Sequence, residues 1–192
     1  LLFCPSKRYS KAVTLNKNNV KMKDFSKIVE EWAMKYKPMQ HVPGESSPNQ
    51  RFFMVADIMQ APDFMSKISK TKTPCVLYEY MWEAEIKGGK VMPDYTVYFP
   101  VCTGTSKPNP RLEHKAIMES AAHAFEFLTW LRGEQEKERP ELKQLDTEHA
   151  IIRPFGPLYD GWYTMYLSIS DVDTFSACVN PNNYIELEGS YE

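Results

Sequence analysis

The chain has 192 residues, of which 43% are hydrophobic and 25% charged, and its formal net charge is −2. This composition is typical of one globular domain with a substantial core, and the near-neutral charge disfavours a general nucleic-acid binder, which needs a basic face. No apolar run reaches the roughly 18 residues of a membrane-spanning helix.

Residues 1–21 are polar, rich in Lys and Asn and without hydrophobic period, so we expect a disordered leader that adds nothing to the core. Met22 stands directly before a helical pattern and is a candidate for the natural start, which leaves residues 22–192 as a single domain. Apolar residues at helical spacing predict an amphipathic helix from about Asp24 to Lys37, which Pro38 ends. These residues are Phe25, Ile28, Val29, Trp32 and Tyr36.

A β-hairpin is predicted in the middle of the chain. Residues 51–56 are a short apolar run that fits a strand or the start of a helix, and residues 63–68 fit one helical turn. Residues 75–86 alternate between apolar and mostly acidic positions, which is typical of a half-solvated strand. Gly88-Gly89 predicts the turn, and residues 94–102 are then the return strand.

Asn109 and Pro110 predict the start of a long helix, because Asn is a good cap and Pro suits the first helical position. The helix is expected to run to about Arg132 and to stop at Gly133. An apolar line at helical spacing indicates that the helix lies along a flat apolar surface. The line consists of Ile117, Ala121, Ala124, Leu128 and Leu131.

A second hairpin is predicted over residues 151–170, with Asp160-Gly161 as its two-residue turn and Ile152 opposite Ile169. Its first arm contains Pro154 and Pro157, which cannot donate to a ladder, so this arm must be bent or lie at a sheet edge. An arm and turn that project from the sheet offer their side chains to a partner. The candidate subunit-interface residues are Phe155, Leu158, Tyr159, Asp160 and Trp162.

The order of elements predicts an α+β fold: a mostly antiparallel sheet built from two hairpins, one long helix packed on a face, and an N-terminal amphipathic helix. Many aromatic residues lie on strands that are apolar on both faces, which indicates either a thick core or a sheet covered by another subunit. Residues 1–37 are basic, and the chain after Arg153 carries only acidic charges. This asymmetry fits ordinary solvation or a head-to-tail contact between copies.

No catalytic, cofactor or metal motif is present, so we expect no enzyme activity, no cofactor and no bound metal. His114 and His123 lie nine residues apart on opposite sides of one helix and cannot chelate one ion. We interpret all four histidines as surface residues. Asp171 and Asp173 suit a hard cation, but no third acidic ligand lies nearby in sequence. The four cysteines are scattered and are expected to be reduced.

Four segments, in this order, resemble the small tail-terminator and head–tail connector (neck) proteins of tailed bacteriophages. They are DFSKIVEEWAMKYKP, TPCVLYEYMWEAEIKGGKVMPDYTVYFPVC, PRLEHKAIMESAAHAFEFLTWLRG and IIRPFGPLYDGWYTMYLSIS. The segments KPMQHVPGESSPNQRFF and PCVLYEY are also similar to proteins of Bacteroidetes phages and prophages. The resemblance covers residues 22–185 and rests on element order, with no diagnostic residue motif. The basic leader departs from the pattern.

The resemblance implies a non-enzymatic ring, typically a hexamer, that caps the tail tube and joins it to the head. Its partners are then further copies of itself, tail-tube proteins and head-connector proteins, and nucleic acid and membrane are not among them. Its location is the virion, and the host cytoplasm during assembly. A different class stays open: a small monomeric binding domain or accessory enzyme encoded by a mobile element. The oligomeric state separates the two.

Overall fold

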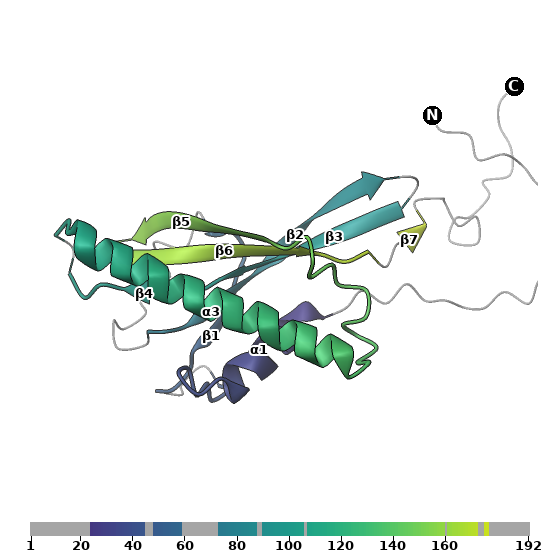
Figure 1. Cartoon of the computed structure of the whole chain (residues 1–192), viewed down its shortest axis with the longest axis horizontal. Coiled ribbons are helices and arrows are strands. Elements are labelled where there is room, and N and C mark those ends of the chain that lie inside the picture. Colours follow the sequence, from purple (N-terminus) through teal and green to yellow (C-terminus); the bar gives the residue numbers. More distant parts are fainter. Residues whose placement is uncertain are drawn as a thin grey trace, which may run out of the picture.

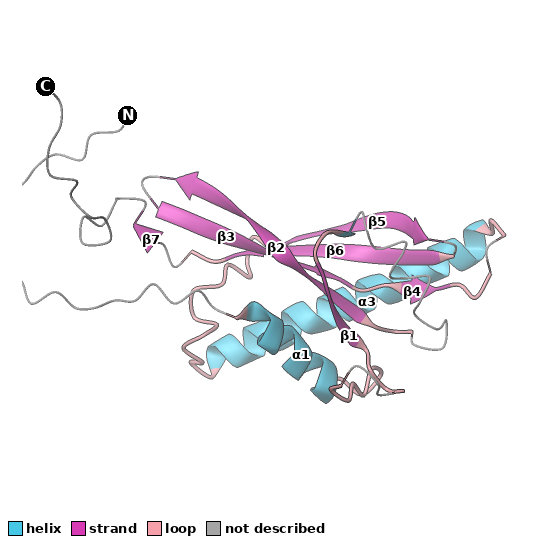
Figure 2. Cartoon of the chain, turned by 180° about the vertical axis from the view of Figure 1, so that it is seen from behind, coloured by secondary structure: helices cyan, strands magenta, loops and turns pink. Residues whose placement is uncertain are grey.

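The protein folds as an α+β structure in which two helices pack on one face of a curled mixed sheet (Figures 1 and 2). The structure is a computed structural model and describes residues 24–44, 48–58, 73–87, 90–105, 107–159, 161–172 and 175–176. In chain order the elements are α1 (Phe25–Lys35), β1 (Phe52–Val55), β2 (Val76–Lys87), β3 (Lys90–Tyr98), β4 (Val101–Cys102), α3 (Pro110–Glu136), β5 (Ile151–Tyr159), β6 (Trp162–Ser170) and β7 (Phe175–Ser176). The predicted α+β class is confirmed.

The sheet is mixed rather than built from antiparallel hairpins alone. β1 pairs with β2 in parallel, with Phe52 opposite Val76, and β2 then pairs antiparallel with β3. β6 lies between β5 on one side and β3 and β4 on the other. β7 pairs with the first two residues of β3, Lys90 and Val91. The run 51–56, for which strand and helix were both open, therefore contains a strand. The run 63–68 lies outside the described residues.

β5 occupies a sheet edge, where prolines are tolerated because no further ladder needs their missing donors. In the described sheet β5 pairs only with β6, and its register shifts between Phe155 and Tyr159. Because of this shift, Ile152 lies opposite Leu167. The predicted pairing of Ile152 with Ile169 is wrong by two residues. The arm is thus both bent and at the edge.

α1 forms because its apolar residues share one face, which is buried in the main core. Phe25 stacks on Tyr95 with ring centroids 4.6 Å apart, and the Trp32 ring meets Phe99 edge-on at 5.7 Å. Such aromatic pairs stabilise a core beyond their buried area. The helix packs by this face against β2 and β3.

α3 continues past Gly133 to Glu136, one turn beyond the predicted stop. The added turn is held by the loop that follows: the Gln135 amide donates to the carbonyl oxygens of Leu142 at 2.9 Å and Leu145 at 2.8 Å. Thr147 donates to the Gln135 side-chain oxygen at 2.7 Å. These long-range bonds outweigh the weak helix propensity of a single glycine.

The sheet is buried on both faces. The main core lies between the sheet and both helices, and includes Val97, Phe127 and Leu167. A second cluster on the opposite face contains Leu77 and Tyr98, which are paired across β2 and β3. Of the two interpretations of the aromatic strands, the thick core fits β2 as far as Tyr78, whereas Tyr80 and Met81 further along the strand are exposed. Cys75 and Cys102 are free thiols, and no helix among the described residues is both long and apolar enough to span a membrane.

Candidate functional site

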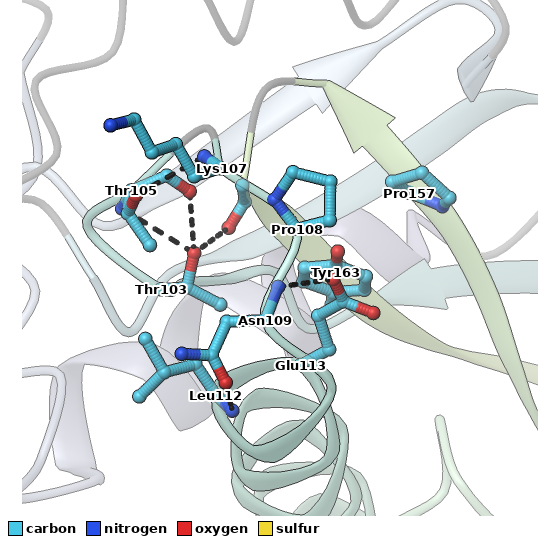
Figure 3. Close-up of a pocket in the computed structure, with 10 residues that line it drawn as sticks. Thr103, Thr105, Lys107, Pro108, Asn109, Leu112, Glu113, Pro157 and Tyr163 are labelled. Atoms are coloured by element: carbon cyan, nitrogen blue, oxygen red, sulfur yellow. Dashed lines mark hydrogen bonds between the residues drawn. The ribbon is translucent and has the colours of Figure 1, made fainter.

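One end of the molecule has a pocket of about 260 Å³, formed where the β5–β6 turn meets the start of α3 (Figure 3). Three segments that are distant in sequence line it: the β5–β6 hairpin, the loop after β4 and the first turn of α3. The lining residues are Thr103, Thr105, Lys107, Pro108, Asn109, Leu112, Glu113, Pro157, Gly161 and Tyr163. This pocket adjoins the hairpin for which the sequence predicts an interface.

Hydrogen bonds fix the loop against the hairpin turn. The Thr103 hydroxyl contacts the carbonyl oxygens of Thr105 at 2.9 Å and Gly161 at 3.2 Å, and the Thr103 amide donates to Gly161 at 2.8 Å. Gly161 has φ +76°, and a Cβ there would lie 2.4 Å from the Thr105 carbonyl oxygen. Only glycine fits at this position, because any side chain would clash with the loop that packs against the turn. The turn and the loop are thus in close backbone contact at this end of the pocket.

The first turn of α3 satisfies its own polar groups. The Asn109 side chain accepts from the amides of Arg111 and Leu112 at 3.1 and 3.3 Å, and Glu113 accepts from the Asn109 amide at 3.0 Å (Figure 3). Burial and the Glu113 carboxylate raise the pKa of Tyr163. Because a carboxylate faces this helix end and several of its amides are already bonded, the pocket is poorly suited to an anion.

A second hollow of about 500 Å³ lies beside β1, and buried His41 is in its wall. Nδ1 of His41 accepts from the amides of Arg51 at 2.9 Å and Phe52 at 3.4 Å, so Nε2 carries the proton and donates to Glu30 at 3.3 Å. Both ring nitrogens are occupied in joining α1 to β1. His41 is therefore a structural residue, and the prediction that it is a surface histidine is wrong.

His123 is also buried, which corrects its predicted surface position. Its Nδ1 lies 2.9 Å from the Tyr36 hydroxyl, while Nε2 has no hydrogen-bond partner among the described residues. Burial lowers its pKa, and the nearby carboxylates of Glu119 and Glu126 oppose that shift only in part. His114 and His149 are exposed, as predicted.

On the other face of the sheet, a carboxylate is bonded to a buried phenol. The Tyr98 hydroxyl donates to Glu79 at 2.8 Å. Burial raises the pKa of both groups, and the Glu79 carboxylate adds to the shift at Tyr98. Among the described residues, no three potential metal ligands lie close together. Asp171 is buried, and Asp173 lies outside the described part of the chain.

The structure separates the candidate interface residues of the second hairpin. Trp162 is 1% exposed and Leu158 is 7% exposed, and both belong to the second core cluster. Phe155 is partly buried, with its ring 5.8 Å from Tyr98. The expected outward orientation of the Trp162 ring is therefore wrong, because the chain covers this large apolar surface itself. The Tyr159 side chain and Asp160 lie outside the described residues, and a subunit contact at this hairpin stays a prediction.

Two surfaces carry exposed apolar residues; the one on α3 was not predicted, whereas apolar residues on both faces of the strand over residues 75–86 were. The first, here called the outer stripe, lies on α3 and consists of Arg111, Lys115, Met118, Ala122, Phe125 and Thr129, all exposed. The second, here called the ribbon, comprises residues 80–87 of β2 and 90–94 of β3; it carries exposed Tyr80 and Met81. The recurrence of the stripe at alternating steps of three and four residues was visible in the sequence.

Comparison with known proteins finds no matching family model, no similar curated protein and no similar solved structure.

Proposed function

We propose that this protein is a non-enzymatic structural component of a tailed phage or prophage particle, which assembles with copies of itself into a ring. The carrying observation is the pair of exposed apolar surfaces. The outer stripe includes Met118 and Phe125, which are 57% and 56% exposed, and the ribbon includes Met81, which is 65% exposed. Single exposed apolar residues are ordinary, whereas grouped ones mark interaction sites.

Two different surfaces favour a ring over a simple dimer. A two-fold dimer uses the same patch on both subunits, whereas contact between two different patches passes head to tail from copy to copy. Such a contact closes into a ring when the rotation between neighbours allows it. The observed pair of surfaces thus supports the ring that the resemblance to neck proteins implies.

The element order also supports the proposal. The finer architecture that we associate with neck proteins is an N-terminal helix, a hairpin, a long helix and a closing hairpin. α1, the β2–β3 pair, α3 and the β5–β6 pair follow this order. In this role the ring, a hexamer in the typical case, caps the tail tube and binds the head connector. Its place is the virion.

The test has two parts. Sedimentation velocity and negative-stain electron microscopy of the wild-type chain should show a closed ring at high concentration. Mass spectrometry of gradient-purified particles, induced from a strain that carries the gene, should find its peptides in constant proportion to the major capsid protein. A chain that is absent from the particles contradicts the structural role. The competing monomeric binding domain predicts one monomeric species at every concentration.

A further inference from the structure

The solvent face of α3 is unusual for a surface helix. Its buried line runs through Ser120, Phe127 and Leu131, and the outer stripe lies on the opposite side. Surface helices normally carry charged residues there. On α3 the middle of that side is instead occupied by Met118, Ala122 and Phe125, which span two helical turns.

The outer stripe is basic at one end. Arg111 and Lys115 precede its apolar residues along the helix, and both are exposed. No hydrogen bond or ion pair of the Lys115 ammonium is found among the described residues. The N-terminal part of the stripe thus combines an apolar strip with two positive charges.

The part of the ribbon next to its bulge is acidic, at Glu83 and Glu85, whereas the paired residues Lys87 and Lys90 are at its tip. Three residues of β2, 80–82, lie opposite the single β3 residue Tyr95, so β2 forms a β-bulge at this point. The ribbon extends beyond this bulge. Tyr80 and Met81 are exposed at the bulge, and Glu83 and Glu85 are exposed just after it. A bulge re-aims side chains of the strand that carries it.

The spacing of the two surfaces matches. Met81, Glu83 and Glu85 follow one another at about 6–7 Å along a strand. Met118, Lys115 and Arg111 follow one another at about 4–6 Å along a helix. A ribbon that runs toward the N-terminus of the helix therefore brings Met81 to Met118 while both glutamates approach the basic pair.

The two surfaces lie too far apart to meet within one chain. The far end of the ribbon and the N-terminal end of α3 lie at opposite ends of the described structure (Figures 1 and 2). A single chain thus cannot bring the ribbon tip to its own basic helix end. Because the ribbon points in the N-to-C direction of α3 within one chain, the pairing of Met81 with Met118 needs a neighbour that is turned so that its α3 runs against the ribbon.

We propose that the ribbon of one copy docks on the outer stripe of α3 in the next copy, with Tyr80 and Met81 against Met118 and Phe125, and with Glu83 and Glu85 facing Lys115 and Arg111. This inference rests on the proposed ring and names the contact that builds it. Burial of the apolar residues supplies affinity, and the charges select the head-to-tail orientation.

A pair of variants tests the contact. Met81→Glu disables the ribbon, and Phe125→Glu disables the outer stripe. Each variant alone should self-associate at least about tenfold more weakly than wild type in sedimentation velocity. An equal mixture should form a dimer and nothing larger, because the intact ribbon of one variant meets the intact stripe of the other. Met34→Glu, at an exposed methionine of α1, is the matched control and should assemble normally.

A charge exchange tests the orientation. Lys115→Glu should weaken association about tenfold, and adding Glu83→Lys should restore most of it. Circular dichroism checks that each variant is folded. If Met81→Glu assembles normally while Phe125→Glu does not, helices pair with helices and the proposal is wrong. A wild-type chain that stays monomeric at all concentrations, or a mixture without dimer, also overturns it. Rings that survive both variants refute this contact but not the ring.

Discussion

The hydroxyl of Tyr36 lies 2.9 Å from Nδ1 of His123, which joins the end of α1 to the middle of α3. The two rings meet nearly edge to face, with centroids 5.6 Å apart. Only 6% of His123 is exposed, and Glu119 lies 4.0 Å from its Nε2. Because burial disfavours the imidazolium form, the pKa of His123 is lower in the folded protein than its ordinary value of 6.5.

This lowered pKa predicts acid sensitivity. The unfolded chain binds a proton at His123 more readily than the folded chain, so the contribution is fully present above about pH 6.5 and is lost as the pH falls toward the folded pKa. The free energy of unfolding should fall less between pH 7 and pH 5 in His123→Phe than in wild type. Urea titrations at several pH values measure it. His114→Gln, at an exposed site, should keep the wild-type slope; equal slopes in all three proteins would contradict the assignment.

Arg139 should stabilise the protein more at neutral pH than at acidic pH. Its guanidinium lies 2.9 Å from Glu31 of α1 and 3.0 Å from Glu134 of α3, and it also contacts Glu141. Arg139 is the main cause of the lowered pKa of Glu31, while Lys137 and then Arg139 lower that of Glu134.

Since these folded pKa values lie below the ordinary 4.5, the stabilisation is fully present above that pH and is lost as the pH falls through the folded pKa values. Arg139→Gln should cost about 1 kcal/mol at pH 7 and less than that at pH 3. Urea unfolding at both pH values gives the comparison. A loss of equal size at both would show that Arg139 acts through packing rather than charge.

The sequence predicts both helices but orients α3 imperfectly. Its apolar residues Ile117 and Ala121 lie only at the margin of the core, whereas Ser120 is completely buried. A serine carries no apolar signal, so hydrophobic periodicity assigns it to the solvent side. Its role depends on strands that meet it only in the folded state.

Ser120 bridges the break between β3 and β4. Its hydroxyl donates to the Phe99 carbonyl oxygen at 2.6 Å and accepts from the Met165 amide at 2.6 Å. Ser120→Ala should cost about 1–3 kcal/mol, because these two buried backbone groups each lose a partner. Denaturant unfolding measures the loss. Thr129→Ala removes a hydroxyl from the exposed side of the same helix and should change stability by less than about 0.5 kcal/mol.

The second hairpin shows the same limit of sequence reasoning. The Asp160-Gly161 signal and the two prolines identify the turn and the edge position, because both depend on local backbone chemistry. The side on which Trp162 lies depends on the shift within β5 and on residues of β1 and β2 that complete the second cluster. The outer stripe was missed for a related reason: the spacing of residues along a helix shows which of them share a face, but not whether that face is buried.

Trp162 is therefore expected to be a stability residue. Trp162→Ala should cost about 3–5 kcal/mol, the range for a large aromatic residue truncated in a core. Phe125→Ala, which truncates a 56% exposed aromatic residue of α3, should leave the stability of the monomer within about 0.5 kcal/mol. Guanidinium unfolding at low protein concentration separates the two. Similar losses would mean that Phe125 is covered in the free chain.

Gly161 and Gly104 allow the cost of a clash to be separated from the cost of backbone strain. Both have similar positive φ values, +76° and +77°, which alanine tolerates poorly. A Cβ at Gly104 meets open space, whereas a Cβ at Gly161 would lie 2.4 Å from the Thr105 carbonyl oxygen. Gly104→Ala should cost about 1 kcal/mol from strain alone. Gly161→Ala should cost clearly more, because the loop bonded to the turn through Thr103 must move, and chemical denaturation of the two variants measures the difference. Equal losses would show that the loop gives way freely and that the pocket wall it forms is not rigid.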